Sequence, residues 1–346
     1  MQGPRRALRE GVNGLFLPYP SKPEVKTVRS LLLFVTAVTS GVSVFGQTAI
    51  PDRMNAAGAL IQQGHYAEAI ATLKTIDQSS PLSDHERGRA ETLLGLAYKD
   101  TGHMLEAEQS YEKALTMLAH GSLKSPDYGR ALSCLGSLKL EAGDLESGAR
   151  ALRQAAQVEN QLNDHVGLTT VDLHLVSIAI NRKHWREARR YLEAAKAQAS
   201  LSGTDARALS ADIDGTTGWL ASVTSHTSEA VSAYTDALED CKRVYGVQHP
   251  LTGWAYLLAG KASAMNGDVP AGLATMRAGL AILKDTVGTR NAKYLTGELA
   301  YAKVLEQAGM HPEAQQVHAE ASWSLASLHG QECMSCTVSV WSLQNR

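Results

Sequence analysis

Phenylalanine is nearly absent from this chain of 346 residues. Its three copies, Phe16, Phe34 and Phe45, all fall in the N-terminal stretch, and aromatic residues make up only 5 % of the sequence. The residues after position 46 therefore have to form their core mainly from Ala, Leu and Gly. Small contact residues suit closely packed helices better than a β-sandwich. We therefore predict an all-α protein.

Recognisable catalytic motifs are also missing. The sequence has no Gly-rich phosphate loop, no H-E-x-x-H motif and no G-x-S-x-G nucleophile turn. The twelve histidines are scattered, and several fall at the repeat turns described below, where we interpret them as polar loop residues. We therefore expect no enzyme activity, no cofactor and no metal site.

Cysteine is scarce, with four copies in the whole chain. Cys134 and Cys241 stand alone on predicted helices, which is typical of small buried hydrophobic residues. Cys333 and Cys336 form a C-x-x-C near the end, and in an exported chain this pair can form a local disulfide. A redox or metal-binding role for the pair is the alternative interpretation, although Thr337 replaces the His needed for haem attachment.

The N-terminal 46 residues have the charge pattern of an export signal. They carry six basic and two acidic residues, which leaves a net charge of about −6 for the rest of the chain. Lys26 and Arg29 precede an apolar run that starts at Leu31, and small residues follow up to Gly46, as in a secretory signal peptide. A mildly acidic body has no general attraction for phosphate backbones, so we expect no nucleic-acid partner.

These features predict a non-native or disordered leader at 1–24 and a signal peptide at 25–46. Cleavage after Gly46 would give a secreted or periplasmic product. The alternative is an uncleaved anchor over residues 31–50, which is long enough to cross a bilayer. In that case the protein is a membrane-tethered assembly factor.

A six-residue phrase recurs seven times along the chain and is the strongest signal in the sequence. Each copy opens with a turn residue, usually Gly, which suits the left-handed conformation that ends a helix. Each copy closes with a small residue, which lets two helices approach closely. Successive copies start 38 to 42 residues apart, at Gly64, Gly102, Gly143, Lys183, Ser225, Gly267 and Gly309.

Two further positions in each unit lie at a fixed distance from the phrase and have the same kind of side chain in most units. Twelve residues before the closing small residue, six of the seven units have Gly or Ala, and the exception is Val176. Four residues after it, the side chain is nearly always large and apolar. Small residues at one helix contact and bulky ones at the next are what ridge-into-groove packing of paired helices requires.

This pattern resembles the tetratricopeptide repeat family over roughly Met54 to Leu328. The 40–42 residue spacing, and the stretch from Tyr245 to Gly260, are similar to the longer variety found in kinesin light chains. The resemblance implies a right-handed superhelical solenoid of about seven helix-turn-helix repeats over residues 47–330. A C-terminal tail with the C-x-x-C would follow at 331–346.

The resemblance also implies a ligand groove, because the first helix of each unit lines the concave surface in that family. Arg and Trp dominate interface energetics, so the groove is expected to bind a segment of a partner protein. The alternative is a solvated face with aromatic residues packed between units. The projected groove residues are Arg89, Lys99, Arg130, Trp219, Trp254, Lys261 and Lys303.

Overall fold

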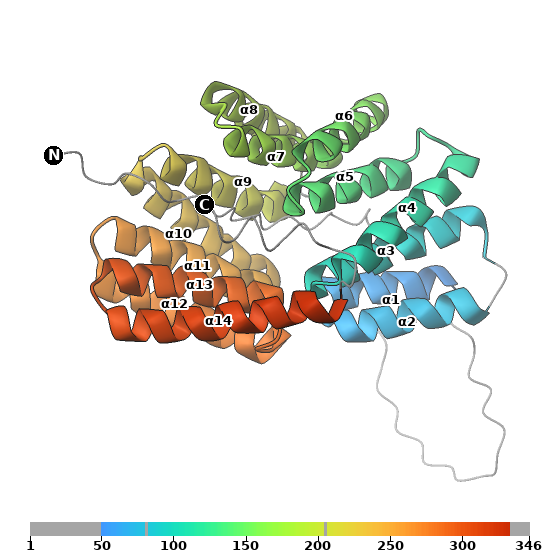
Figure 1. The fold of residues 1–346 in the computed structure, drawn as a ribbon. Helices are drawn as coiled ribbons and strands as arrows, with labels where there is room; N and C mark the ends of the chain where they lie inside the picture. The colour runs from blue at the N-terminus through green and yellow to red at the C-terminus, as the bar shows by residue number, and fades with distance from the viewer. Residues whose placement is uncertain (1–49, 80–81, 204–205, 333–346) are drawn as a thin grey trace, which may run out of the picture.

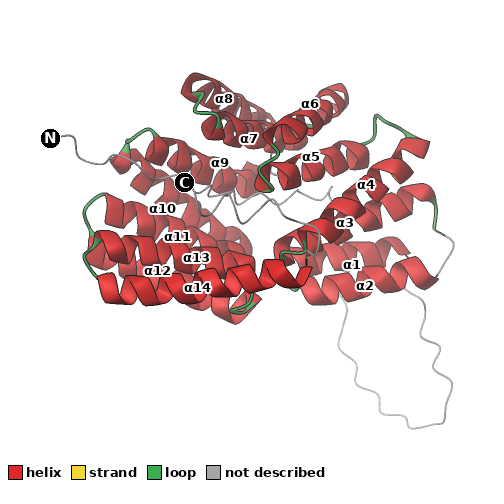
Figure 2. Cartoon of the chain, viewed as in Figure 1, coloured by secondary structure: helices red, strands yellow, loops and turns green. Residues whose placement is uncertain are grey.

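The computed structural model describes residues 50–79, 82–203 and 206–332, and over these ranges it contains fourteen helices and no strand (Figures 1 and 2). Consecutive helices pair into seven hairpins, so the predicted fold class is confirmed. The first helices are α1 (Ile50–Gln62), α3 (Asp84–Thr101), α5 (Pro126–Glu141), α7 (His165–Asn181), α9 (Ala206–Val223), α11 (Pro250–Met265) and α13 (Ala292–Gln307). The second helices are α2 (Tyr66–Ser79), α4 (Met104–Gly121), α6 (Leu145–Leu162), α8 (Trp185–Leu201), α10 (Thr227–Tyr245), α12 (Val269–Val287) and α14 (His311–Glu332).

Every hairpin turns at the residue that opens the repeated phrase. All seven of these residues have a positive φ, including Lys183 at 60° and Ser225 at 65°, which are not glycine. At the first turn, the Gly64 N–H donates to the Ile61 carbonyl and the His65 N–H to the Leu60 carbonyl. The other six turns repeat this pair of bonds, which is the Schellman arrangement that ends a helix.

The alternation of small and large residues sets how closely the two helices of a hairpin pack. A Cβ added at Gly95 would lie 2.5 Å from the ring of Tyr111, and one added at Gly218 would lie 2.8 Å from the ring of Tyr234. Each pair joins the small residue of a first helix to the large residue of the second. The small and large residues that recur in the sequence are therefore the residues at which the two helices of a hairpin touch.

Gly260 and Gly58 provide a matched test of this packing. A Cβ at Gly260 would lie 2.6 Å from the carbonyl oxygen of Gly272, whereas a Cβ at Gly58 would meet nothing within 4 Å. We expect Gly260→Ala to lower the free energy of unfolding by about 2 kcal/mol, because helix backbones would have to separate. Gly58→Ala should raise it by about 0.5–1 kcal/mol, because alanine favours the helix interior. Urea unfolding followed by circular dichroism measures both, and effects of the same sign would contradict the packing.

The stack of hairpins curls until its last units return to its first (Figure 1). The Nε2 atom of His249 lies 2.6 Å from the carbonyl oxygen of Gln62, 187 residues away in sequence. The next residue, Pro250, covers the neighbouring turn so closely that a Cβ on Gly64 would lie 2.9 Å from its ring. Unit six therefore rests on the turn of unit one.

A second set of contacts repeats this docking one unit further along. The Asn291 side-chain amide donates to the carbonyl oxygen of Asp100 at 3.4 Å, and Lys293 Nζ lies 3.6 Å from the Asp100 carboxylate. The methyl group of Ala292 lies beside Gly102. His249 and Asn291 cap α11 and α13 at equivalent repeat positions, so unit seven rests on unit two in the same manner. We call these two sets of contacts the clasp.

Candidate functional site

The projected groove residues all lie on first helices of the hairpins, in the part of the chain that the structure describes. Arg89 and Lys99 are on α3, Arg130 is on α5, Trp219 is on α9, Trp254 and Lys261 are on α11, and Lys303 is on α13. We call the side of the stack to which the resemblance assigns them the inner face.

Two of the cations meet at one carboxylate. Arg89 Nε lies 3.7 Å from one oxygen of Asp127, and Arg130 lies 3.5 Å from the other. His85 Nε2 is 3.0 Å from the same carboxylate. Asp127 therefore offsets much of the positive charge of these two projected groove residues.

Lys99 is only 8 % exposed, and its Nζ lies 3.2 Å from Glu141 on the next unit. Burial opposes the charge of Lys99, but the Glu141 and Asp100 carboxylates outweigh it and raise the pKa of Lys99. The ammonium group is thus part of a buried ion pair. A groove anchor would need an exposed cation at this position, whereas the structure shows a buried one.

His174 was missed by the sequence reasoning because it is neither at a turn nor among the projected positions. It is buried inside α7, 40 residues after the buried Cys134 and so at the equivalent place of its unit. Burial and the positive charge of Lys99 lower the pKa of His174 to about 3. Aligning the repeat register from Cys134 would have placed it in the interior.

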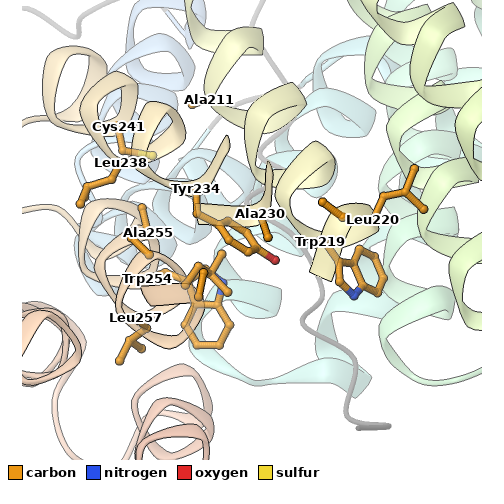
Figure 3. Packing of buried hydrophobic residues seen from close by; sticks show 14 of the residues in the cluster. Ala211, Trp219, Leu220, Ala230, Tyr234, Leu238, Cys241, Trp254, Ala255 and Leu257 are labelled. Carbon is orange, nitrogen blue, oxygen red and sulfur yellow. The ribbon is translucent and has the colours of Figure 1, made fainter. Parts of the chain in front are cut away.

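The two tryptophans belong to the largest core cluster. Trp219 is 8 % exposed and Trp254 is 7 % exposed, and both belong to the same cluster as Tyr234, which lies between them in Figure 3. The interpretation as aromatic residues packed between units therefore describes these two side chains. Lys261 and Lys303 are half-buried.

The buried indole N–H of Trp254 has no hydrogen-bond partner among the described residues. Such a donor costs about 1–3 kcal/mol relative to one that is satisfied. Buried hydroxyl groups on other first helices bond to their own helix, as Thr92 does to the Gly88 carbonyl at 2.8 Å and Ser177 to the Leu173 carbonyl. Trp254 differs from these two residues because its buried donor has no such acceptor.

Several expectations lie outside the described residues. These are the leader at 1–24, the signal peptide at 25–46, the alternative anchor at 31–50 except its last residue, and the pair Cys333 and Cys336.

Within the described ranges, no helix is both long and apolar enough to cross a membrane. The same ranges contain no group of three or more His, Cys, Asp or Glu side chains that could hold a metal ion. Cys134 and Cys241 are free thiols and buried, as predicted.

The chain is similar in one unit of its sequence, and in its fold, to known helical repeat proteins. A sequence profile of the tetratricopeptide repeat matches residues 91–117, within α3 and α4. A search of curated proteins found no match. Among solved structures, a Rap protein complexed with Competence and Sporulation Factor has a TM-score of 0.57 at 11 % identity, covering 82 % of this chain and 78 % of its own.

One further structure places the fold in the same class. The APC/C hetero-tetramer Cut9-Hcn1 has a TM-score of 0.50 at 16 % identity and covers 79 % of this chain and 55 % of its own. A kinesin light chain-like repeat protein from Podosopora anserina matches at 14 % identity over 72 % of this chain and 99 % of its own. Its TM-score of 0.31 is too low to carry an argument, so the kinesin-light-chain variety stays a prediction. Residues 91–117 therefore match a tetratricopeptide repeat in sequence, and the seven hairpins that share the turn and packing pattern of this unit have the fold of a helical repeat solenoid.

Proposed function

We propose that this protein is an exported, non-catalytic binding module that holds a segment of a partner protein against its inner face. The observation that carries the proposal is the buried Trp254 indole N–H without an acceptor. A partner segment that drew the Trp254 side chain out toward the inner face and supplied a carbonyl oxygen to its N–H would recover the cost of the unmade hydrogen bond. The Rap structure, which was solved as a complex, supports this use of a similar fold.

The pairing of Arg89 and Arg130 with Asp127, and of Lys99 with Glu141, limits the attraction of the inner face for acidic ligands. The indole N–H of Trp254, which is a donor only, instead suits a carbonyl group of a polypeptide backbone. The proposed ligand is therefore an uncharged stretch of chain. The export part of the proposal rests on residues 25–46, and N-terminal sequencing of the mature protein should start at Gln47.

Trp254→Phe tests the binding site because it keeps most of the ring and removes the N–H. Once affinity capture with the full chain has identified a partner, we expect this variant to bind it about tenfold more weakly, as expected for one lost hydrogen bond. The melting temperature of the free variant should stay equal or rise, because an unsatisfied donor has been removed.

Trp323→Phe is the matched control, since Trp323 is exposed on a second helix, α14, away from the inner face. It should leave binding unchanged. Equal binding by the wild type and by Trp254→Phe would overturn the proposed role of the inner face.

A further inference from the structure

The turn of the fourth hairpin differs in charge from the other six. Residues 182–190 contain five cations and one anion, a net charge of +4. The equivalent nine residues of every other unit carry a net charge of −1 or −2. The cations, which we call the basic tip, are Arg182, Lys183, Arg186, Arg189 and Arg190.

The basic tip is exposed and only partly neutralised. Lys183, Arg186, Arg189 and Arg190 are all exposed, and Figure 1 shows α8 on the outer rim of the ring. Arg182 pairs with Glu146 of the preceding unit, and Arg190 lies 3.8 Å from Glu187. No salt bridge within 4.0 Å involves Lys183, Arg186 or Arg189 in the described part of the chain.

These cations work against the local structure. They lie at the start of α8, where the helix dipole favours negative charge. Lys183 has a left-handed backbone at φ 60°, which glycine adopts at lower cost in five other units. The α8 N-cap, His184, makes no capping hydrogen bond, a feature that it shares with His103 of α4 and His226 of α10. A segment whose charge and turn residue both depart from local preference is expected to be functional.

The composition of the basic tip favours an acidic protein over other polyanions. Half-buried Trp185 and Tyr191 lie among the arginines, and Arg190 stacks on the Tyr191 ring at 5.1 Å, a mixture typical of protein interfaces. No large apolar side chain is exposed between 182 and 190, so there is nothing to insert into a lipid surface. Arg190 already covers the Tyr191 ring, which closes that face to the base stacking by which single-stranded nucleic acid binds.

We propose that the basic tip is a docking surface for an acidic segment of a partner protein, separate from the inner face. The two surfaces lie on different helices, so a partner could be held at both. Failure of one proposal leaves the other standing, because Trp254 is not part of the basic tip.

Binding of a fluorescent oligoglutamate peptide to the full chain tests this surface. We expect Arg186→Ser, Arg189→Ser and Arg190→Ser together to weaken binding at least tenfold. The matched control replaces Lys113, Arg277 and Lys284, three exposed cations elsewhere, by serine, and should change affinity less than twofold. Both variants lower the net charge from −2 to −5, so only the position of the charges differs.

Affinity should also fall as salt rises from about 0.01 M to about 0.1 M, because the screening length shortens roughly threefold. Equal loss in both variants would show that only overall charge matters and would overturn the proposal. Tip-dependent binding to phosphatidylserine vesicles or single-stranded DNA without binding to the peptide would overturn the choice of an acidic protein. Tip-dependent self-association in sedimentation would assign the surface to a second copy and overturn it as well.

Discussion

Replacing His249 by alanine should open the ring of hairpins. In the folded chain the Nδ1 atom of His249 accepts a hydrogen bond from the Leu251 N–H at 3.2 Å, so Nε2 carries the proton and donates it to the Gln62 carbonyl. The imidazole also stacks on Tyr245, with ring centroids 4.9 Å apart. Loss of the cap and of the buried hydrogen bond should lower the free energy of unfolding by about 2–4 kcal/mol. Small-angle X-ray scattering should report a larger radius of gyration.

The same site gives a pH dependence. Burial lowers the pKa of His249, with a further lowering from Lys293 and opposing effects from the Gln62 hydrogen bond and Asp100. The unfolded chain then binds a proton at a higher pH than the folded one, so stability falls as the pH drops below about 6.5. His249→Ala should lose this part of the pH profile. The control is His311→Ala, at an exposed position, which should keep the wild-type pH profile. A radius of gyration that is unchanged in His249→Ala would contradict the clasp.

Replacing Glu159 by glutamine should stabilise the protein at alkaline pH. The Glu159 carboxyl group is wedged between two first helices: a Cβ at Gly129 would lie 2.3 Å from it, and one at Gly167 would lie 2.6 Å from it. Burial, and then the neighbouring Asp164 carboxylate, raise the pKa of Glu159 to about 8. The side chain is therefore largely protonated at neutral pH, and glutamine copies its shape and neutral state.

The direction in which stability changes with pH follows from the proton that Glu159 holds in the folded chain. Between about pH 4.5 and pH 8 the folded chain holds a proton on Glu159 that the unfolded chain has released, so wild-type stability falls as the pH rises. Glutamine has no such transition, and Glu159→Gln should be more stable near about pH 9 by at most about 5 kcal/mol. Thermal melts across this range provide the measurement. The exposed Glu193→Gln should follow the wild-type profile, and parallel profiles of Glu159→Gln and wild type would contradict the buried carboxyl group.

The hairpins could be predicted because their determinants are local. Even Lys183 and Ser225, which lack the freedom of glycine, adopt the predicted left-handed turn, since the paired helices and two hydrogen bonds enforce it. The contact of Gly95 with Tyr111 likewise joins residues only 16 positions apart. Register along the sequence was enough to find both.

The site was harder to predict, because its properties depend on contacts between units. Lys99 has the sequence position of a groove cation, and only the placement of α5 beside α3 pairs it with Glu141 and buries it. The two tryptophans were assigned to the correct helices, but their burial depends on the packing of neighbouring hairpins. The contact of His249 with Gln62 depends on the curvature summed over five hairpins, which no local pattern records.

A solenoid usually tolerates gain or loss of a repeat, because each unit contacts only its neighbours. The two-rung contact of His249 and Asn291 with the carbonyls of Gln62 and Asp100 removes that freedom here. Deleting one hairpin between the second and the sixth would leave both capping residues short of their acceptors. The number of units is therefore constrained by closure of the circle, and variation in length should be confined to segments beyond it.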